Sequence, residues 1–220
     1  AVYNIGRKAA SRAELEEYIT CVDDLIATGQ GDYGGRAHRV RWHTETARAN
    51  VPALLCAEGP KMLHLGGRIC DGVIAGTGLL GEVISDTKER IAAGARAEGR
   101  DPDDVDVWFT TRSSLDRDRD VAIRKVHPSV SSILNHSMRF SLDNKNLPGQ
   151  FRDKVAEYVA GYELYDHVLQ SGRNPKRMAE LGLTDYAMDR FALAGNVADW
   201  IERIGSLATS GATNIWFNGE

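Results

Sequence analysis

Cysteine is scarce in this 220-residue sequence, and long apolar runs are missing from it. The three cysteines, Cys21, Cys56 and Cys70, are odd in number and lack the spacing of metal ligands. They therefore indicate reduced thiols and a cytoplasmic protein rather than a disulfide framework. No run approaches the roughly 20 apolar residues of a membrane helix, and the first residues do not form a signal peptide, so we expect no membrane partner.

An excess of basic charge is also missing. The 27 Lys and Arg residues are outnumbered by 31 Asp and Glu residues, giving a net charge of −4, which argues against nucleic acid as a partner. The histidines have no metal-ligand spacing with one another or with the cysteines, so no metal site is expected. The hydrophobic content of 42% is ordinary for a globular protein and allows one domain over residues 1–220.

The most informative segment that is present covers residues 51–75. Two apolar runs, 51–57 and 72–75, flank a helix-sized segment that opens with Glu58-Gly59-Pro60. Buried parallel strands are continuous apolar runs, and proline suits the first turn of a helix, so the pattern predicts a βαβ unit. The turn before the helix is either a simple tight turn or a phosphate site formed by the free N–H groups of the helix start.

Further elements extend this alternation. Strands are expected at 105–111 and 214–217, and a short outer strand at 39–42. Helices are expected at 11–29, at 81–98, from 116 to a break or kink at Pro128, at 151–169 and from Asn196. This alternation indicates an α/β fold with a parallel sheet. Residues 137–189 do not fit it, and we expect an insertion there.

Five phrases in collinear order make the chain similar to a known family. They lie at residues 57–63, 67–74, 99–105, 189–195 and 211–214. Through them the chain resembles the luciferase-like oxidoreductases, which use a flavin or a deazaflavin and include methylenetetrahydromethanopterin reductase. The resemblance implies a (β/α)₈ TIM barrel. The four expected strands amount to about half of such a barrel, and the sequence begins at Ala1 without a methionine. We therefore expect the second half of the barrel, with a late helical insertion, cut from a longer polypeptide.

The resemblance also implies a function, an oxidoreductase that transfers hydride to, or monooxygenates, a small organic substrate. Its cofactor would be coenzyme F-420, with FMN as the alternative, and the family commonly forms homodimers. The cofactor phosphate would be held by two loops, the first cofactor loop (Ala57, Glu58, Gly59 and Pro60) and the second cofactor loop (Gly76, Thr77 and Gly78). Catalytic residues of the family come from earlier strands, so none is assigned here. Sugar-phosphate-oxidising relatives place a lysine after the second loop, where this chain has Leu79-Leu80, which argues against glucose 6-phosphate.

Three polar residues in or beside the insertion are candidates for substrate contact: Asn135, His136 and His167. The favoured alternative is that the histidines pack against neighbouring helices. Two other functions stay open. A non-catalytic half-barrel would bind a flavin-type ligand, or pair with another subunit, without turnover. An aldolase- or isomerase-type barrel would need a lysine or a carboxylate base at a strand end, and no lysine stands at the end of an expected strand.

Overall fold

A parallel sheet organises the part of the chain that the computed structural model describes, residues 6–41, 51–167, 169 and 172–219. Its strands are β3 (Leu54–Ala57), β4 (Gly72–Ala75), β5 (Asp106–Leu115), β6 (Ala192–Gly195) and β7 (Asn214–Gly219). The helices between them are α2 (Pro60–Ile69), α3 (Gly81–Ala97), α4 (Arg119–Met138), α5 (Gly149–Ala160), α6 (Arg173–Glu180), α7 (Thr184–Phe191) and α8 (Val197–Thr209). The α/β class and all four expected strands of the parallel sheet are confirmed.

The long strand β5 is the centre of the sheet. Its first residues pair with β4, which pairs in turn with β3, and its last residues pair with β6. Strand β7 pairs with Trp108–Ser113 of β5. Trp108 and Phe109 pair with both β4 and β7, and Arg112 and Ser113 pair with both β6 and β7. Strand β7 therefore lies along one edge of β5, and β4 and β6 lie along the other. Among the described residues the sheet is open, since β3 pairs with β4 alone.

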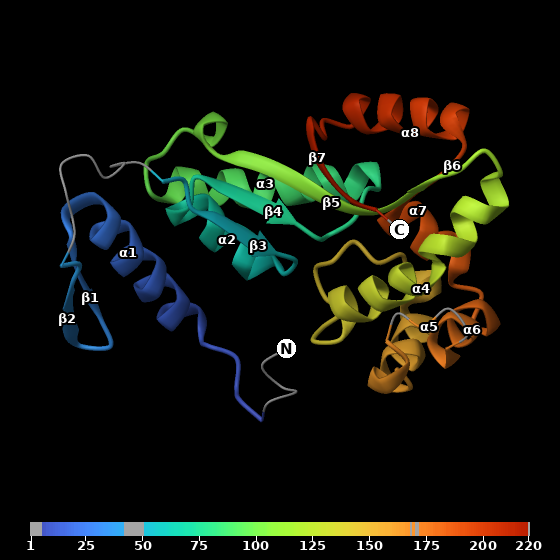
Figure 1. Ribbon diagram of the computed structural model, residues 1–220, viewed down its shortest axis with the longest axis horizontal. Helices are drawn as coiled ribbons and strands as arrows, with labels where there is room; N and C mark the ends of the chain where they lie inside the picture. The colour runs from blue at the N-terminus through green and yellow to red at the C-terminus, as the bar shows by residue number, and fades with distance from the viewer. Residues whose placement is uncertain (1–5, 42–50, 168, 170–171, 220) are drawn as a thin grey trace.

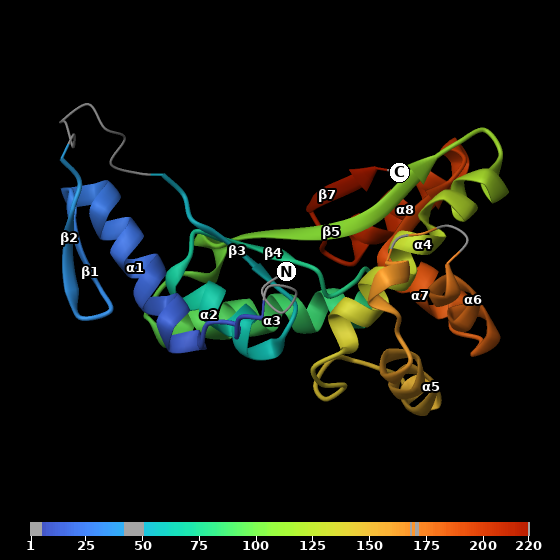
Figure 2. The same ribbon diagram turned by 60° about the horizontal axis from the view of Figure 1, so that its bottom comes forward.

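The two faces of the sheet have different surroundings. Leu55, Ala57, Val73 and Phe109 belong to one hydrophobic cluster with residues of α2 and α3, which lie below the sheet in Figure 2. Because side chains alternate along a strand, Cys56, Ile74, Trp108, Thr110 and Arg112 point to the other face. The sequence left open which set of β5 side chains faces the helices, and the structure assigns Val107 and Phe109 to that role.

A helix and a hairpin precede the sheet and lie at one end of the molecule (Figure 1). Helix α1 (Arg12–Thr28) begins with the expected capping box between Ser11 and Glu14. Strands β1 (Gln30–Tyr33) and β2 (Arg36–Arg39) then pair antiparallel. Gly34 and Gly35, with φ of 61° and 69°, form a two-residue turn that needs positive φ at both positions. The outer strand expected at 39–42 lies earlier, at Arg36–Arg39, and residue 42 is outside the described residues.

The late helices form a second core at the other end (Figure 1). Helix α4 continues through Pro128 to Met138, so the expected break there is wrong. Buried residues of α4, α5, α6 and α7 form one cluster that includes Val130, Leu134, Tyr158 and Met178. The helix expected over 151–169 is shorter: α5 ends at Ala160, and the 3₁₀ turn η3 (Leu164–Asp166) follows. None of the helices in the described segments is both long and apolar enough to cross a membrane.

Candidate functional site

The two cofactor loops lie side by side at the carboxyl ends of β3 and β4. Ala57 and Ala75 are register partners in this parallel pair, so the residues after them leave the sheet at the same edge. The Gly76 N–H donates to the Ala57 carbonyl at 3.1 Å. The Ser137 hydroxyl of α4 lies 3.1 Å from the Gly76 carbonyl and 3.2 Å from Oε2 of Glu58. The structure therefore brings the predicted loops together and attaches them to the end of α4.

The start of α2 has no side-chain cap, and in its first turn the Met62 N–H donates to the Gly59 carbonyl at 3.0 Å, while no backbone hydrogen bond of the Lys61 N–H is found among the described residues. Gly59 is the N-cap with φ −97°, Pro60 occupies the first turn, and no side chain caps the helix. A Cβ built on Gly59 would meet nothing within 4 Å. An uncapped helix start with free space in front of it attracts anions through its N–H groups and its dipole. This donor set fits a cofactor phosphate, which Ala57, Gly59 and Pro60 would border.

The second cofactor loop is constrained by close contacts. Gly78 has φ +116°, and a Cβ there would come within 2.5 Å of the Arg190 side chain. A Cβ on Gly76 would come within 2.8 Å of Oε1 of Glu58. Thr77 is buried, and its hydroxyl lies 2.9 Å from that of Thr87 in α3. Larger residues at 76 and 78 would therefore displace Glu58 and Arg190.

Glu58 is the chemically distinctive residue of the first loop. Burial raises the pKa of its carboxyl to about 7, against the opposing effects of the Ser137 hydroxyl and of Lys145, Arg139 and Arg112. Nε2 of His136 lies 3.4 Å from Oε1 of Glu58. Burial, and then the charge of Arg139, lower the pKa of His136. In both groups burial disfavours the charged form, so each pKa moves toward the neutral state.

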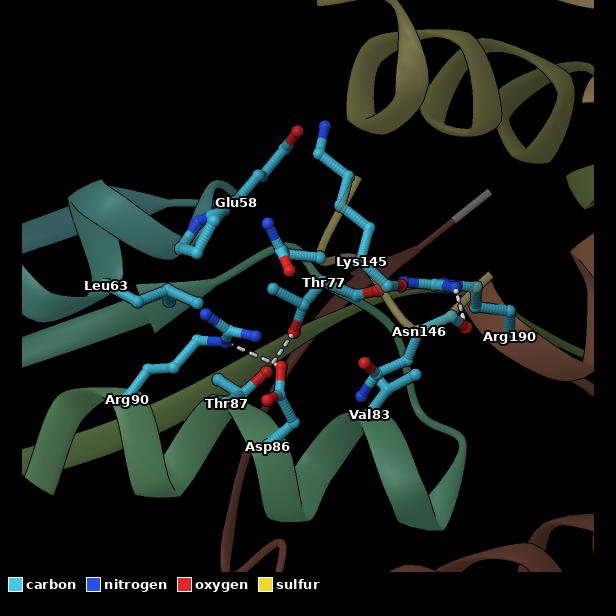
Figure 3. Close-up of a pocket in the computed structure, with 12 residues that line it drawn as sticks. Glu58, Leu63, Thr77, Val83, Asp86, Thr87, Arg90, Lys145, Asn146 and Arg190 are labelled. Carbon is cyan, nitrogen blue, oxygen red and sulfur yellow. Dashed lines mark hydrogen bonds and ion pairs between the residues drawn. The ribbon is translucent and has the colours of Figure 1, made fainter. Parts of the chain in front are cut away.

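The charges of Lys145, Arg139 and Arg112 act on this carboxyl, and the sequence singled out none of the three. In Figure 3 the side chains of Glu58 and Lys145 point toward one another above a small pocket. The Lys145 ammonium donates to the Ser137 carbonyl, and burial lowers its pKa while Glu58 opposes that shift. The cavity is small, about 10 Å³, and is bordered by α2, α3 and residues 144–146. These three side chains bring positive charge to the first cofactor loop, for which the sequence alone indicated only a glycine turn.

Arg190 connects the segments that border the pocket. It is 2% exposed, and its guanidinium donates to the carbonyls of Thr77, Lys145 and Asn146 and to the Tyr186 hydroxyl, at 2.7–3.1 Å. The second cofactor loop and the 145–146 turn are thereby fixed to α7. These bonds use four of the five N–H donors of the guanidinium, so we assign Arg190 the role of positioning the loops.

The three candidate substrate residues have separate surroundings. The His136 side chain is 51% exposed and contacts Glu58, so the structure brings it to the first cofactor loop. His167 contacts the Tyr162 hydroxyl at 2.7 Å and the Ser132 hydroxyl at 3.1 Å. Asn135 is buried within α4, where its carbonyl accepts the Arg139 N–H. Asp71 accepts a hydrogen bond from the Ala53 N–H at the amino end of the strands, a structural role.

Comparison with known proteins gives a consistent result. The sequence model of a family described as luciferase-like monooxygenase matches residues 2–214. A 5,10-methylenetetrahydromethanopterin reductase of Methanolobus tindarius is 30% identical over 199 residues, which are 90% of this chain and 54% of that protein. The coenzyme F-420-dependent tetrahydromethanopterin reductase of Methanopyrus kandleri superposes with a TM-score of 0.66 at 20% identity, over 97% of this chain and 59% of that one. An F-420-dependent secondary alcohol dehydrogenase gives a TM-score of 0.63 at 14% identity, over 96% and 58%. The chain therefore spans a little over half the length of these proteins.

Proposed function

The chain belongs to the luciferase-like monooxygenase family, and from that premise we propose that it is the cofactor-phosphate-binding part of an oxidoreductase. The proposed cofactor is coenzyme F-420, with FMN as the alternative, because relatives that use F-420 are prominent among the similar proteins. The observation that carries the proposal is the adjacency of the two cofactor loops at the carboxyl ends of β3 and β4, where βα barrels place their active sites.

The bound deazaflavin or flavin would supply the hydride chemistry, and the residues of this chain would bind, orient and manage protons. The uncapped start of α2 binds the phosphate. Glu58 lies beside it with a pKa of about 7, so it exchanges a proton near neutral pH, as a general acid or base must. His136, neutral in the same range, orients that carboxyl.

The proposed substrate is a small organic molecule, and glucose 6-phosphate is disfavoured. Leu79 follows the second cofactor loop, is 1% exposed and belongs to the core beneath the sheet. It therefore offers no cation where a sugar-phosphate-oxidising relative would carry a lysine.

The test is a fluorescence titration of the 220-residue chain with coenzyme F-420 and, in parallel, with FMN. Gly59→Trp should weaken binding at least tenfold, because the indole would fill the free space in front of the α2 start. Gly149→Trp is the matched control, since Gly149 also lies at a helix start beside a proline and faces free space. Equal affinity in the two variants would refute the phosphate site, and failure of the wild type to bind either cofactor would refute the function.

We further propose that the open sheet is one part of a (β/α)₈ barrel closed by additional strands, with residues 137–189 as an insertion within a single domain. The exposed apolar side chains of the uncovered face support closure, since Leu54 and Trp216 are 43% and 50% exposed. A homodimer is the proposed assembly, and sedimentation equilibrium tests it.

A further inference from the structure

We propose that Ser137 is the positioning residue of Glu58, and that its hydroxyl donates to the Gly76 carbonyl only while Glu58 carries a proton. The protonation of the first cofactor loop is thereby coupled to the hydrogen bonding of the second. This inference rests on the proposed function, which it deepens by assigning the residue that directs the proton of the acid–base group.

Ser137 differs from the other buried serines near it in α4. The hydroxyls of Ser129 and Ser131 donate back to carbonyls of their own helix, at 2.9 Å and 2.7 Å, as helical serines commonly do. The Ser137 hydroxyl instead leaves its helix and lies 3.1 Å from the Gly76 carbonyl and 3.2 Å from Oε2 of Glu58. Ser137 therefore bridges the two cofactor loops.

The single proton of this hydroxyl cannot serve both acceptors fully. When Glu58 is protonated, its O–H donates to the Ser137 oxygen, and Ser137 donates onward to the Gly76 carbonyl. When Glu58 is ionised, it has no proton to donate, and its charge makes it the stronger acceptor. The Ser137 hydroxyl then turns to the carboxylate, and the Gly76 carbonyl loses this donor.

Burial gives the exchange of partners a consequence. Ser137 is 3% exposed and Gly76 is buried, so water does not readily take the place of the hydroxyl. A buried carbonyl that loses its donor is costly. Ser137 itself is held in place, because the Lys145 ammonium donates to its backbone carbonyl. Ionisation of Glu58 therefore weakens the attachment of the second cofactor loop to α4.

The other charged groups near Glu58 leave this route distinct. Nε2 of His136 lies 3.4 Å from Oε1, whereas Ser137 contacts Oε2. Burial raises the pKa of Glu58 to about 7, and the Ser137 hydroxyl opposes that rise, as a donor to the ionised form does. The charged and titratable groups that act on Glu58 or border the cavity beside it are His136, Arg139, Lys145, Arg112, Asp86, Arg90 and Arg190.

The carbonyl of Gly76 can be observed on its own. Gly76-Thr77 is the one Gly-Thr pair in the sequence. Glycine labelled with ¹³C at the carbonyl and threonine labelled with ¹⁵N therefore give one cross-peak in an NMR spectrum that correlates each carbonyl with the next amide. In the free 220-residue chain we expect its ¹³C resonance to titrate near pH 7, in the direction of a lost hydrogen bond as the pH rises. A Gly76 resonance that does not titrate would overturn the proposal.

Ser137→Ala should remove most of this pH-dependent shift, because no hydroxyl is left to change partners. Ser129→Ala is the matched control at a buried serine of the same helix, and the shift should persist in it. The electric field of the Glu58 charge would act on the carbonyl without Ser137. An undiminished shift in Ser137→Ala would therefore overturn the role of the hydroxyl.

Glu58→Gln tests the same coupling without removing the serine. The amide is a permanent donor to the Ser137 oxygen, so the Gly76 resonance should stay at its low-pH position at every pH. This variant retains His136, so a titration that persisted in it would belong to another group, and the proposal would fail.

Cofactor titrations separate this inference from the proposed function, because the NMR measurement uses the free chain. If the chain binds neither coenzyme F-420 nor FMN while the Gly76 carbonyl titrates through Ser137, the proposed function fails and the role of Ser137 stands. If a cofactor binds and the carbonyl does not titrate, the role of Ser137 is refuted and the proposed function stands.

Discussion

At the scale of single residues, Glu58 makes the stability of the fold depend on pH. Burial raises the pKa of its carboxyl from 4.5 to about 7, so the folded chain binds more protons than the unfolded chain between these pH values. The free energy of unfolding must therefore fall as the pH rises through this window. Across the whole window, the raised pKa of Glu58 changes the free energy of unfolding by about 3 kcal/mol.

Glu58→Gln should remove this dependence, because an amide resembles the protonated carboxyl and does not titrate. We expect the variant to be more stable than wild type at pH 8 and nearly equal to it at pH 4.5, in urea unfolding followed by circular dichroism. Glu89→Gln, at an exposed carboxylate, is the control. If the difference in the free energy of unfolding between wild type and Glu58→Gln stayed constant from pH 4.5 to 8, the raised pKa of Glu58 would be contradicted.

Arg190 is a second residue with a large predicted effect. Arg190→Met would leave the carbonyls of Thr77, Lys145 and Asn146 without their buried donor. Removing one partner of a buried charged network is far more damaging than removing a surface pair, so we expect a loss of about 3 kcal/mol or more in urea unfolding. Arg152→Met at the surface should cost no more than about 1 kcal/mol. Similar losses in both variants would mean that Arg190 contributes no more than a surface arginine.

At the scale of elements, the packing of α2 on α3 depends on two glycines. A Cβ on Gly67 would lie 1.9 Å from the Ile91 carbonyl oxygen, and one on Gly94 would lie 2.0 Å from that of His64. Gly67→Ala should therefore force the helices apart and lower the free energy of unfolding by about 2 kcal/mol or more. Gly205, in α8, faces free space, so Gly205→Ala should stabilise by about 0.5–1 kcal/mol through helix propensity. Thermal unfolding of the two variants should shift in opposite directions, and a shift of the same sign would refute this packing.

Local sequence signals predicted most of these elements but not all of them. Apolar runs and helix-ending glycines correctly predicted β3, α2, β4 and α3, because each of these signals is contained in a few consecutive residues. The hairpin β1–β2 was missed although Gly34-Gly35 carries the turn signal, since its strands are polar and exposed. Pro128 was expected to break or kink the helix; it does not end α4, because packing of Val126 and Val130 in the late core holds the helix together on both sides of it.

The candidate site was predictable only where it is local. The cofactor loops were placed from their glycines and from the family phrases. The contacts of Glu58 with His136 and Ser137 join positions nearly 80 residues apart, which no spacing rule connects. The approach of Lys145 to Glu58 likewise depends on the turn of residues 144–146, which no local pattern predicts.

At the scale of the whole molecule, the described chain has one covered sheet face and one open face. Helices α2 and α3 cover the first, as Figure 2 shows, and the second carries Cys56, Ile74 and Trp108. Such a face is costly in water, because its apolar side chains gain nothing from folding until they are covered. This asymmetry is what a barrel closed by further strands would remove.

The reactivity of the cysteine thiols can report which face of the sheet is exposed. Cys56 is exposed on the open face, whereas Cys21 and Cys70 are buried and burial raises the pKa of the Cys70 thiol to about 11. We therefore expect one thiol of three to react rapidly with a disulfide reagent in the isolated 220-residue chain, and Cys56→Ser to abolish that phase. If further strands close the proposed barrel in a longer polypeptide, they should protect Cys56, because the same face would then point into the barrel. Slow reaction of the Cys56 thiol in the dilute isolated chain would mean that the open face is already covered. If the reaction then became faster on further dilution, a second copy of the chain would be covering it.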